Sequence, residues 1–201
     1  MGLTQTTKLM AVNTMLSVIG EAPVNTLAAT SQTADVILAQ NLLDEVSREV
    51  QAAGWNFNRE TEVELSPANN NIILPTNTGR VDVEPAHAKN KHYIQRGTKL
   101  YNKTDKTFVI EQAMKCTIVY MLDWDDLPET ARQYVMIRAA RKFQDRVVGS
   151  DKHHAFTQVD EFQALVALRD AETDGGDYTI FDNNDVARVI NRGNVINRIT
   201  T

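Results

Sequence analysis

The feature that most constrains the fold lies between Gln51 and Pro67, where the hydrophobic periodicity of the chain changes. Up to Gly54 the apolar residues recur at the 3-4 spacing of an amphipathic helix. From Asn58 onward apolar and polar residues alternate, which is the pattern of a half-buried strand. The sequence therefore predicts a helix that is joined almost directly to a strand.

The period of two continues from Asn58 to about Leu122 in short runs that are separated by turn-forming residues. The predicted strands are Glu60–Leu65, Ile72–Leu74, Val81–Val83, His92–Gln95, Lys99–Asn102, Thr107–Ile110 and Lys115–Leu122. Strict alternation in the first of them would place Glu60, Glu62 and Glu64 on one solvent-exposed face. These runs predict a compact antiparallel module.

Four helices are predicted around this module, and glycines follow the first three of them. They run over about residues 4–19, 33–53, 126–149 and 153–173. The residues expected to face the core are Leu9, Val12, Leu16 and Ile19; Leu38, Leu42, Val46, Val50 and Ala53; Ala131, Tyr134, Val135, Ala139, Phe143 and Val147; and Phe156, Val159, Phe162 and Val166. Four apolar stripes can be buried if the helices pack against each other.

These elements predict an α+β fold, in which four amphipathic helices form a bundle with an antiparallel β module inserted between helices two and three. Residues 1–57 form the N-terminal helical pair and residues 58–122 the β module. Residues 123–175 form the C-terminal pair of the same bundle, and residues 176–201 an extended tail. The tail has few large apolar residues, so we expect a partner to order it.

Composition excludes several classes of protein. The 201 residues carry a formal net charge of −5, which argues against a protein whose main task is to grip nucleic acid. No apolar run approaches the roughly 20 residues that span a bilayer, so no membrane partner is expected. The single cysteine, Cys116, excludes an internal disulfide. No cofactor is expected, because no glycine-rich loop has the context of a phosphate site.

The strongest catalytic candidates are four carboxylates in LDWDDLPE, namely Asp123, Asp125, Asp126 and Glu129. A pair of carboxylates can hydrolyse a glycosidic bond, one as acid and one as nucleophile or base. Carboxylates just before a helix also complement the positive end of its dipole, and this is the interpretation that we favour. The four histidines lack the spacing of a zinc hydrolase, so no metal site is expected.

A group of arginines on the third predicted helix is the most basic feature of the chain. Arg132, Arg138 and Arg141 are accompanied by acidic residues, and this pattern favours a salt-bridged interface with another subunit or protein over a DNA contact. Three further arginines, Arg188, Arg192 and Arg198, lie in the C-terminal tail. All six are candidates for an interface with another subunit or protein.

Five segments of the chain together resemble a known family. They are AVNTMLSVIGEAPVNTL, VQAAGWNFNRE, RGTKLYN, DDLPETARQYV and AARKFQDRVVGS, in this order. In sequence and spacing they resemble the tail tubular protein A family, the head-to-tail adaptor or gatekeeper of short-tailed podovirus bacteriophages. The resemblance covers residues 9–171 and does not extend to the tail after Gly176.

The resemblance implies a structural virion protein. Members of the family are expected to form a dodecameric ring between the portal protein and the tail nozzle, tail tubular protein B, and to continue the channel for DNA ejection. The six arginines named above would then be candidates for a subunit or portal interface. Double-stranded DNA would pass through without specific binding, which agrees with a net negative charge on each subunit. The protein would reside in the short tail of the virion, and in the host cytoplasm during assembly. The alternative is a tail-associated polysaccharide hydrolase that uses the carboxylates between Asp123 and Glu129.

The junction at which the periodicity changes has its own candidate residues. Gly54 ends the second helix, and Trp55 and Phe57 follow in a segment with almost no other large apolar side chain. We interpret them as a structural joint that packs over the seam between the bundle and the β module, and not as a ligand site.

Overall fold

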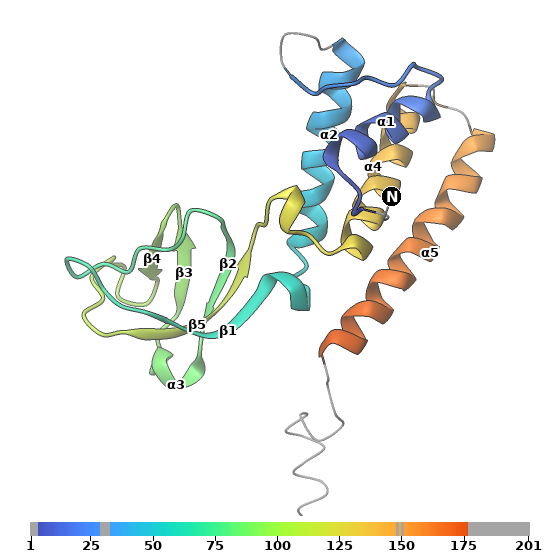
Figure 1. Ribbon diagram of the computed structural model, residues 1–201. Helices are drawn as coiled ribbons and strands as arrows, with labels where there is room; N and C mark the ends of the chain where they lie inside the picture. Colours follow the sequence, from blue (N-terminus) through green and yellow to red (C-terminus); the bar gives the residue numbers. More distant parts are fainter. Residues whose placement is uncertain (1–3, 29–32, 148, 150, 177–201) are drawn as a thin grey trace, which may run out of the picture.

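A computed structural model of the chain describes residues 4–28, 33–147, 149 and 151–176. The helices gather in a bundle, and the strands form a separate β module that projects from one side of it (Figure 1). The element order is two helices, the β module and two further helices, as expected for the predicted α+β fold, which is confirmed. No described helix is long and apolar enough to cross a membrane.

The helices of the bundle begin and end close to the predicted positions. They are α1 (Lys8–Val18), α2 (Ala34–Gln51), α4 (Glu129–Val147) and α5 (Asp151–Gly176). Thr7 and Thr33 precede α1 and α2, and each side chain accepts a hydrogen bond from a backbone N–H of the first turn. The Thr7 cap places the start of α1 later than the sequence predicted, at Lys8, and the Thr33 cap places the start of α2 close to its predicted position. Short 3-10 turns, η2 (Asn56–Asn58) and η3 (Trp124–Asp126), lead out of α2 and into α4.

The core of the bundle contains most of the predicted stripes. From α2 and α4 it takes Leu42, Val46, Val50, Ala131, Tyr134, Val135, Ala139 and Phe143, and from α1 it takes Ala11, Val12, Met15 and Leu16. The prediction was wrong for Leu38, Ala53 and Val147, which are exposed. Ala53 and Val147 lie at or beyond the ends of their helices, and Val36 and Ala39 face the core in place of Leu38.

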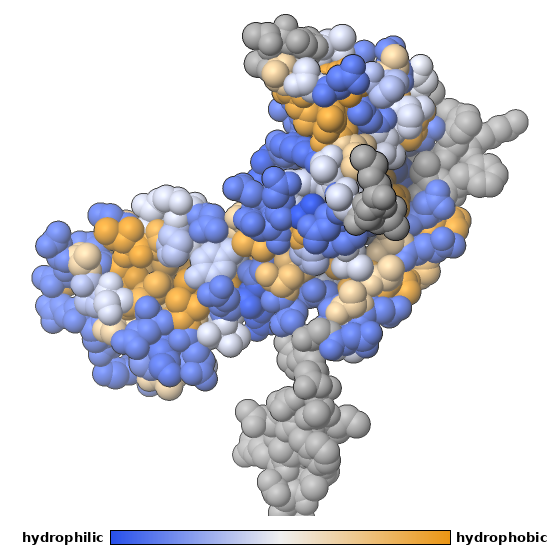
Figure 2. All heavy atoms as spheres, viewed as in Figure 1, coloured by the Kyte–Doolittle hydropathy of each residue, from blue (hydrophilic) through white to orange (hydrophobic). Residues whose placement is uncertain are grey.

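The apolar stripe that the sequence predicted for α5 does not face the bundle core, so this prediction was wrong. Val159, Phe162 and Val166 are exposed, whereas Leu168, on the opposite face of the helix, is fully buried in the bundle core. Figure 2 shows apolar side chains at the molecular surface along α5. The side chain of Phe156 lies outside the described residues. The helix therefore keeps an apolar face that the described part of the chain does not bury.

The β module contains a three-stranded antiparallel sheet and a hairpin. The sheet has the order β1 (Arg59–Leu65), β5 (Met114–Tyr120), β2 (Thr78–Val83), and the hairpin is β3 (Tyr93–Arg96) with β4 (Lys99–Asn102). The predicted strands at residues 72–74 and 107–110 are reduced to isolated bridges. A one-turn helix, α3 (Pro85–Ala88), was not predicted. The module has its own core, which includes Ile72, Leu100, Met114 and Ile118.

The single acidic face predicted for β1 was wrong. Glu60 is paired with Ile118 and Glu64 with Lys115, because a β-bulge shifts the register between Glu60 and Val63. Directly opposed residues of an antiparallel pair share a face, and Ile118 and Lys115 lie on opposite faces of β5. Glu60 and Glu64 therefore point to opposite sides of the sheet.

Gly54 lies where the end of α2 approaches strand β5. Its φ angle is +77°, and a Cβ atom built there would lie 2.9 Å from Cγ2 of Val119 in β5. Gly20 shares the left-handed conformation, with φ +82°, but has nothing within 4 Å of the same position. A substitution at Gly20 therefore introduces backbone strain alone, whereas the same substitution at Gly54 introduces both strain and a steric clash with Val119.

We expect Gly54→Ala to lower the free energy of unfolding more than Gly20→Ala. Each substitution carries the roughly 1 kcal/mol cost of a left-handed non-glycine residue. Gly54→Ala adds about 1–3 kcal/mol, because the methyl group must displace Val119. Urea unfolding of the two variants measures the difference, and equal losses would contradict the close approach.

Candidate functional site

Two buried amides form the joint between the bundle and the β module. The Gln51 side chain donates to Leu122 O at 3.1 Å and accepts from Leu122 N at 2.7 Å, and it also donates to Ser47 Oγ at 3.0 Å. Asn58 donates to Gln51 O at 2.9 Å and to Tyr120 O at 2.8 Å. The two amides therefore tie the end of α2 to the chain that leaves β5. Neither residue was predicted from the sequence, because the sequence alone does not distinguish a buried amide side chain from an exposed one.

The three residues predicted for the joint lie around these amides. Gly54 contacts Val119 of β5 as described above. The Trp55 indole donates to Val50 O at 2.7 Å, and its ring packs on the bundle core. Phe57 is also partly buried against that core. The two aromatic rings thus cover the bundle side of the joint, and Gly54 makes the contact with the sheet.

A second polar cluster fixes the segment before α1 to the start of α4. Thr6 O accepts hydrogen bonds from Trp124 Nε1 at 2.9 Å and from Arg132 Nη1 at 3.1 Å. The Glu129 carboxylate accepts from Thr6 N at 2.9 Å, from Thr6 Oγ1 at 2.5 Å and from Gln133 Nε2 at 2.8 Å. We call Thr6, Trp124, Glu129 and Arg132 the N-terminal lock.

Arg132 has a role that the sequence did not suggest. Its side chain is only 4% exposed, and it donates to Leu127 O at 2.8 Å and to Asp125 O at 2.6 Å as well as to Thr6 O. A buried guanidinium is stabilised when its donors are satisfied in this way. These contacts account for Arg132 within one chain, and its role at a subunit or portal interface remains a prediction.

The four candidate carboxylates do not converge on a cleft. Asp123, Asp125 and Asp126 are exposed, and Glu129 belongs to the N-terminal lock. Of the four, all of which are described residues, only Asp123 lines the 300 Å³ pocket between α2 and η3. Burial would raise the pKa of Glu129, but hydrogen bonds from Gln133 and Thr6 outweigh it and hold that pKa below its usual value. A glycosidase acid needs a raised pKa, so the geometry offers the hydrolase alternative no support.

Other reactive groups of the described residues are inert or isolated. Burial raises the pKa of the Cys116 thiol to about 11, so the thiolate form is disfavoured at neutral pH. Among the described residues no group of three histidine, cysteine, aspartate or glutamate side chains could hold a metal ion.

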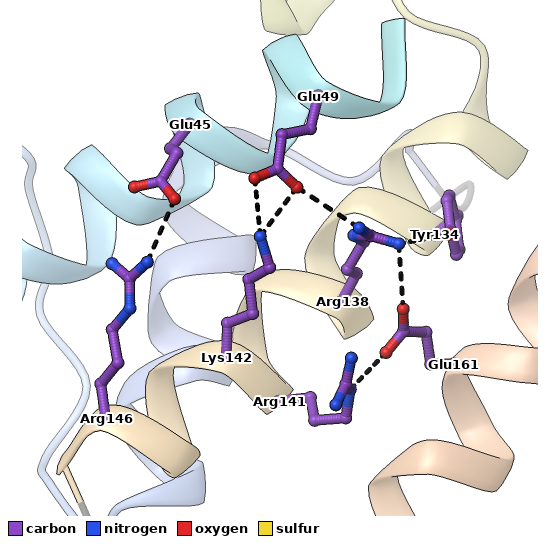
Figure 3. A network of polar contacts seen from close by, with 8 residues as sticks. All are labelled: Glu45, Glu49, Tyr134, Arg138, Arg141, Lys142, Arg146 and Glu161. Atoms are coloured by element: carbon purple, nitrogen blue, oxygen red, sulfur yellow. Dashed lines mark hydrogen bonds and ion pairs between the residues drawn. The ribbon is translucent and has the colours of Figure 1, made fainter. Parts of the chain in front are cut away.

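A network of ion pairs connects α2, α4 and α5 (Figure 3). Arg138 of α4 lies between Glu49 of α2 and Glu161 of α5, at 3.3 Å from each carboxylate. Lys142 also binds Glu49, at 2.7 Å, and Arg141 binds Glu161. The hydrogen bond from Lys142 is the main reason why the pKa of Glu49 is lowered.

The network gives Arg138 and Arg141 partners within the chain, and Arg146 likewise binds Glu45 at 3.1 Å. Arg138 and Arg141 were predicted for contacts between subunits or with the portal, and that role remains a prediction. Arg188, Arg192 and Arg198 lie outside the described residues. The described contacts join the bundle to the β module through a polar joint.

Comparisons with known proteins show which family the chain resembles. A family model described as tail tubular protein matches residues 9–178 of the chain. A curated relative, the Tail tubular protein A of Klebsiella phage KP34, is 27% identical over 165 residues. The matched region covers 81% of this chain and 86% of that protein.

We expect the N-terminal lock to depend on the charge of Glu129. Because its pKa in the folded protein is lower than the ordinary 4.5, its charge stabilises the fold above that pH, and this contribution is lost as the pH falls through the lowered pKa. Glu129→Gln should therefore be less stable than the wild type at pH 7, by about 1–2 kcal/mol for hydrogen bonds to a partly exposed charge. The difference should shrink below pH 4.5.

Chemical denaturation at a series of pH values measures this difference. Thr6→Ala, which removes one hydroxyl donor to the carboxylate, should reduce the pH dependence without abolishing it. A stability difference between Glu129→Gln and the wild type that stays constant from pH 7 to pH 3 would contradict the proposed role of the charge.

Proposed function

Since this chain belongs to the tail tubular protein family and is thus a structural component of a phage tail, we propose that it forms the adaptor ring between the portal and the tail nozzle. In this role copies of the chain surround the channel through which double-stranded DNA leaves the capsid. The relative from phage KP34, which is named Tail tubular protein A, supports this assignment within the family.

The observation that carries the proposal is the two-part construction of the chain. The bundle and the β module have separate hydrophobic cores, and the joint holds them as two ends of one body. An adaptor must contact one neighbour at each end and keep their spacing constant. A bundle can build the wall of a ring, and a projecting module can reach the nozzle, tail tubular protein B.

The charges of the chain fit a channel that DNA crosses without being retained. The formal net charge is −5 for each copy, and a ring multiplies that charge around its axis. Retention of DNA depends on lysines and arginines that replace its counterions, and a net acidic ring lacks that excess. Most arginines of α4 are moreover engaged by carboxylates of the same chain.

The C-terminal segment supplies a candidate contact with the portal. Arg188, Arg192 and Arg198 are its positive charges after Asp185, and no acidic residue follows them. We assign this segment to the portal side of the ring, because a partner with an acidic surface would complement it. Arg132, Arg138 and Arg141 remain candidates for contacts between subunits. The number of subunits, twelve, rests on the family resemblance.

Reconstitution with portal rings tests the proposal directly. Purified full-length chain is mixed with portal rings of the same phage, and the product is imaged by electron microscopy. We expect a second, coaxial ring on one face of the portal. A variant with Arg188, Arg192 and Arg198 changed to alanine should bind the portal more weakly while keeping its thermal stability.

Two outcomes would contradict the proposal. Portal rings that gain no coaxial density at any ratio of the two proteins would exclude an adaptor that binds the portal. Coaxial rings that release sugar from host polysaccharide, and lose this activity on Asp125→Ala, would restore the hydrolase alternative.

A further inference from the structure

One face of α5 is apolar, exposed and directed away from the bundle. Val159, Phe162 and Val166 are 55%, 63% and 37% exposed. They lie on the side of the helix opposite to Leu168, which is fully buried. We call these three residues the α5 stripe. Exposed apolar residues that line up on one helix face are typical of a surface that another protein covers.

A second apolar surface lies on α2. Ile37 and Leu38 are 45% and 38% exposed. Arg48 is also exposed, and it follows Ile37 by three turns on the same side of the helix. We call Ile37, Leu38 and Arg48 the α2 face. The residues of α2 that face the core, such as Leu43 and Val46, lie on its other side.

The two surfaces lie on opposite sides of the bundle, because α4 is between α2 and α5 (Figure 1). The ion pairs show the same order, since Arg138 of α4 binds Glu49 of α2 on one side and Glu161 of α5 on the other. Two different apolar surfaces on opposite sides of one chain are what head-to-tail association requires. Repetition of such a contact produces a ring when the rotation between copies closes.

The charges around the surfaces favour a second copy as the occupant. Asp160 and Asp170 are exposed beside the α5 stripe, together with one exposed arginine, Arg169. Arg48 gives the α2 face the opposite charge, because Asp44, which lies on the same side of α2, is paired with Lys8 at 2.7 Å. A contact between two α5 stripes would bring the aspartates of both copies together, whereas a contact between the α5 stripe and the α2 face pairs acidic with basic residues.

We propose that the α5 stripe of one copy packs on the α2 face of the next copy, and that this is the lateral contact of the ring. The inference rests on the proposed function and names the surface by which the ring would assemble. It also explains why α5 carries apolar residues on its outer side as well as on the side that is buried against the bundle.

Two single variants test the contact from its two sides. Phe162→Glu blocks the α5 stripe and Ile37→Glu blocks the α2 face, and both side chains are exposed, so the fold should be kept. Ile73→Glu, at a residue of the β module that is 56% exposed, is the matched control. Particle size is measured by light scattering and electron microscopy, with portal rings and without them, and folding by circular dichroism.

We expect Phe162→Glu and Ile37→Glu each to abolish ring formation and Ile73→Glu to leave it unchanged. An equal mixture of Phe162→Glu and Ile37→Glu should form dimers and nothing larger. Such a pair contains one intact α2 face and one intact α5 stripe, so a single contact forms and growth stops.

Other results would overturn the inference and identify the occupant. Normal rings from Phe162→Glu that no longer bind the portal would show that another protein covers the α5 stripe. Loss of assembly in Phe162→Glu with normal rings from Ile37→Glu would indicate a contact between two α5 stripes. Wild-type chain that forms no ring with or without the portal would overturn the proposed function, and this inference with it.

Discussion

The hydrogen bonds of Gln51 and Asn58 hold the last turn of α2 against the chain that leaves β5, and the placement of the β module depends on them. Both residues are only 2% exposed. Their hydrogen bonds satisfy the amide nitrogens of both side chains and the oxygen of Gln51, whereas Oδ1 of Asn58 is buried without a partner among the described residues. The Gln51 amide binds both the N–H and the carbonyl of Leu122, much as a neighbouring strand would. A helix end is thus joined to a strand end without leaving those backbone groups unpaired.

The bundle depends in a similar way on α4. Its apolar face takes part in the core that α1 and α2 share, and its charged residues bind carboxylates of α2 and α5. Partly exposed ion pairs of this kind contribute little free energy each, so the apolar core supplies most of the stability. The ion pairs instead fix which turn of α5 lies beside which turn of α4. On the outer side of α5, Val159, Phe162 and Val166 stay exposed.

The sequence allowed much of the fold to be predicted, because hydrophobic periodicity reports which residues are shielded from water. It located the switch from helix to strand and most core residues of α2 and α4. It did not locate the bulge in β1, where Glu62 takes a positive φ of 58° that its side chain does not favour. Nor did it distinguish Gln51 and Asn58 from exposed amides, since burial of a polar residue depends on a partner that is distant in the chain. The catalytic interpretation of LDWDDLPE had the same weakness, because proximity in sequence did not bring the carboxylates into one cleft.

The outcome for α5 shows what periodicity does and does not report. Phe162 and Val166 follow helical spacing as regularly as Val135 and Phe143 do, yet only the second pair is buried within the chain. An apolar stripe indicates that some surface covers it, and that surface can belong to another copy as well as to the same chain. The helix with the most apolar surface left exposed is therefore the one from which the contact between copies in the proposed ring can best be inferred. The acidic residues that flank the α5 stripe narrow the choice further, because they disfavour self-pairing of α5 and favour a surface with an exposed arginine.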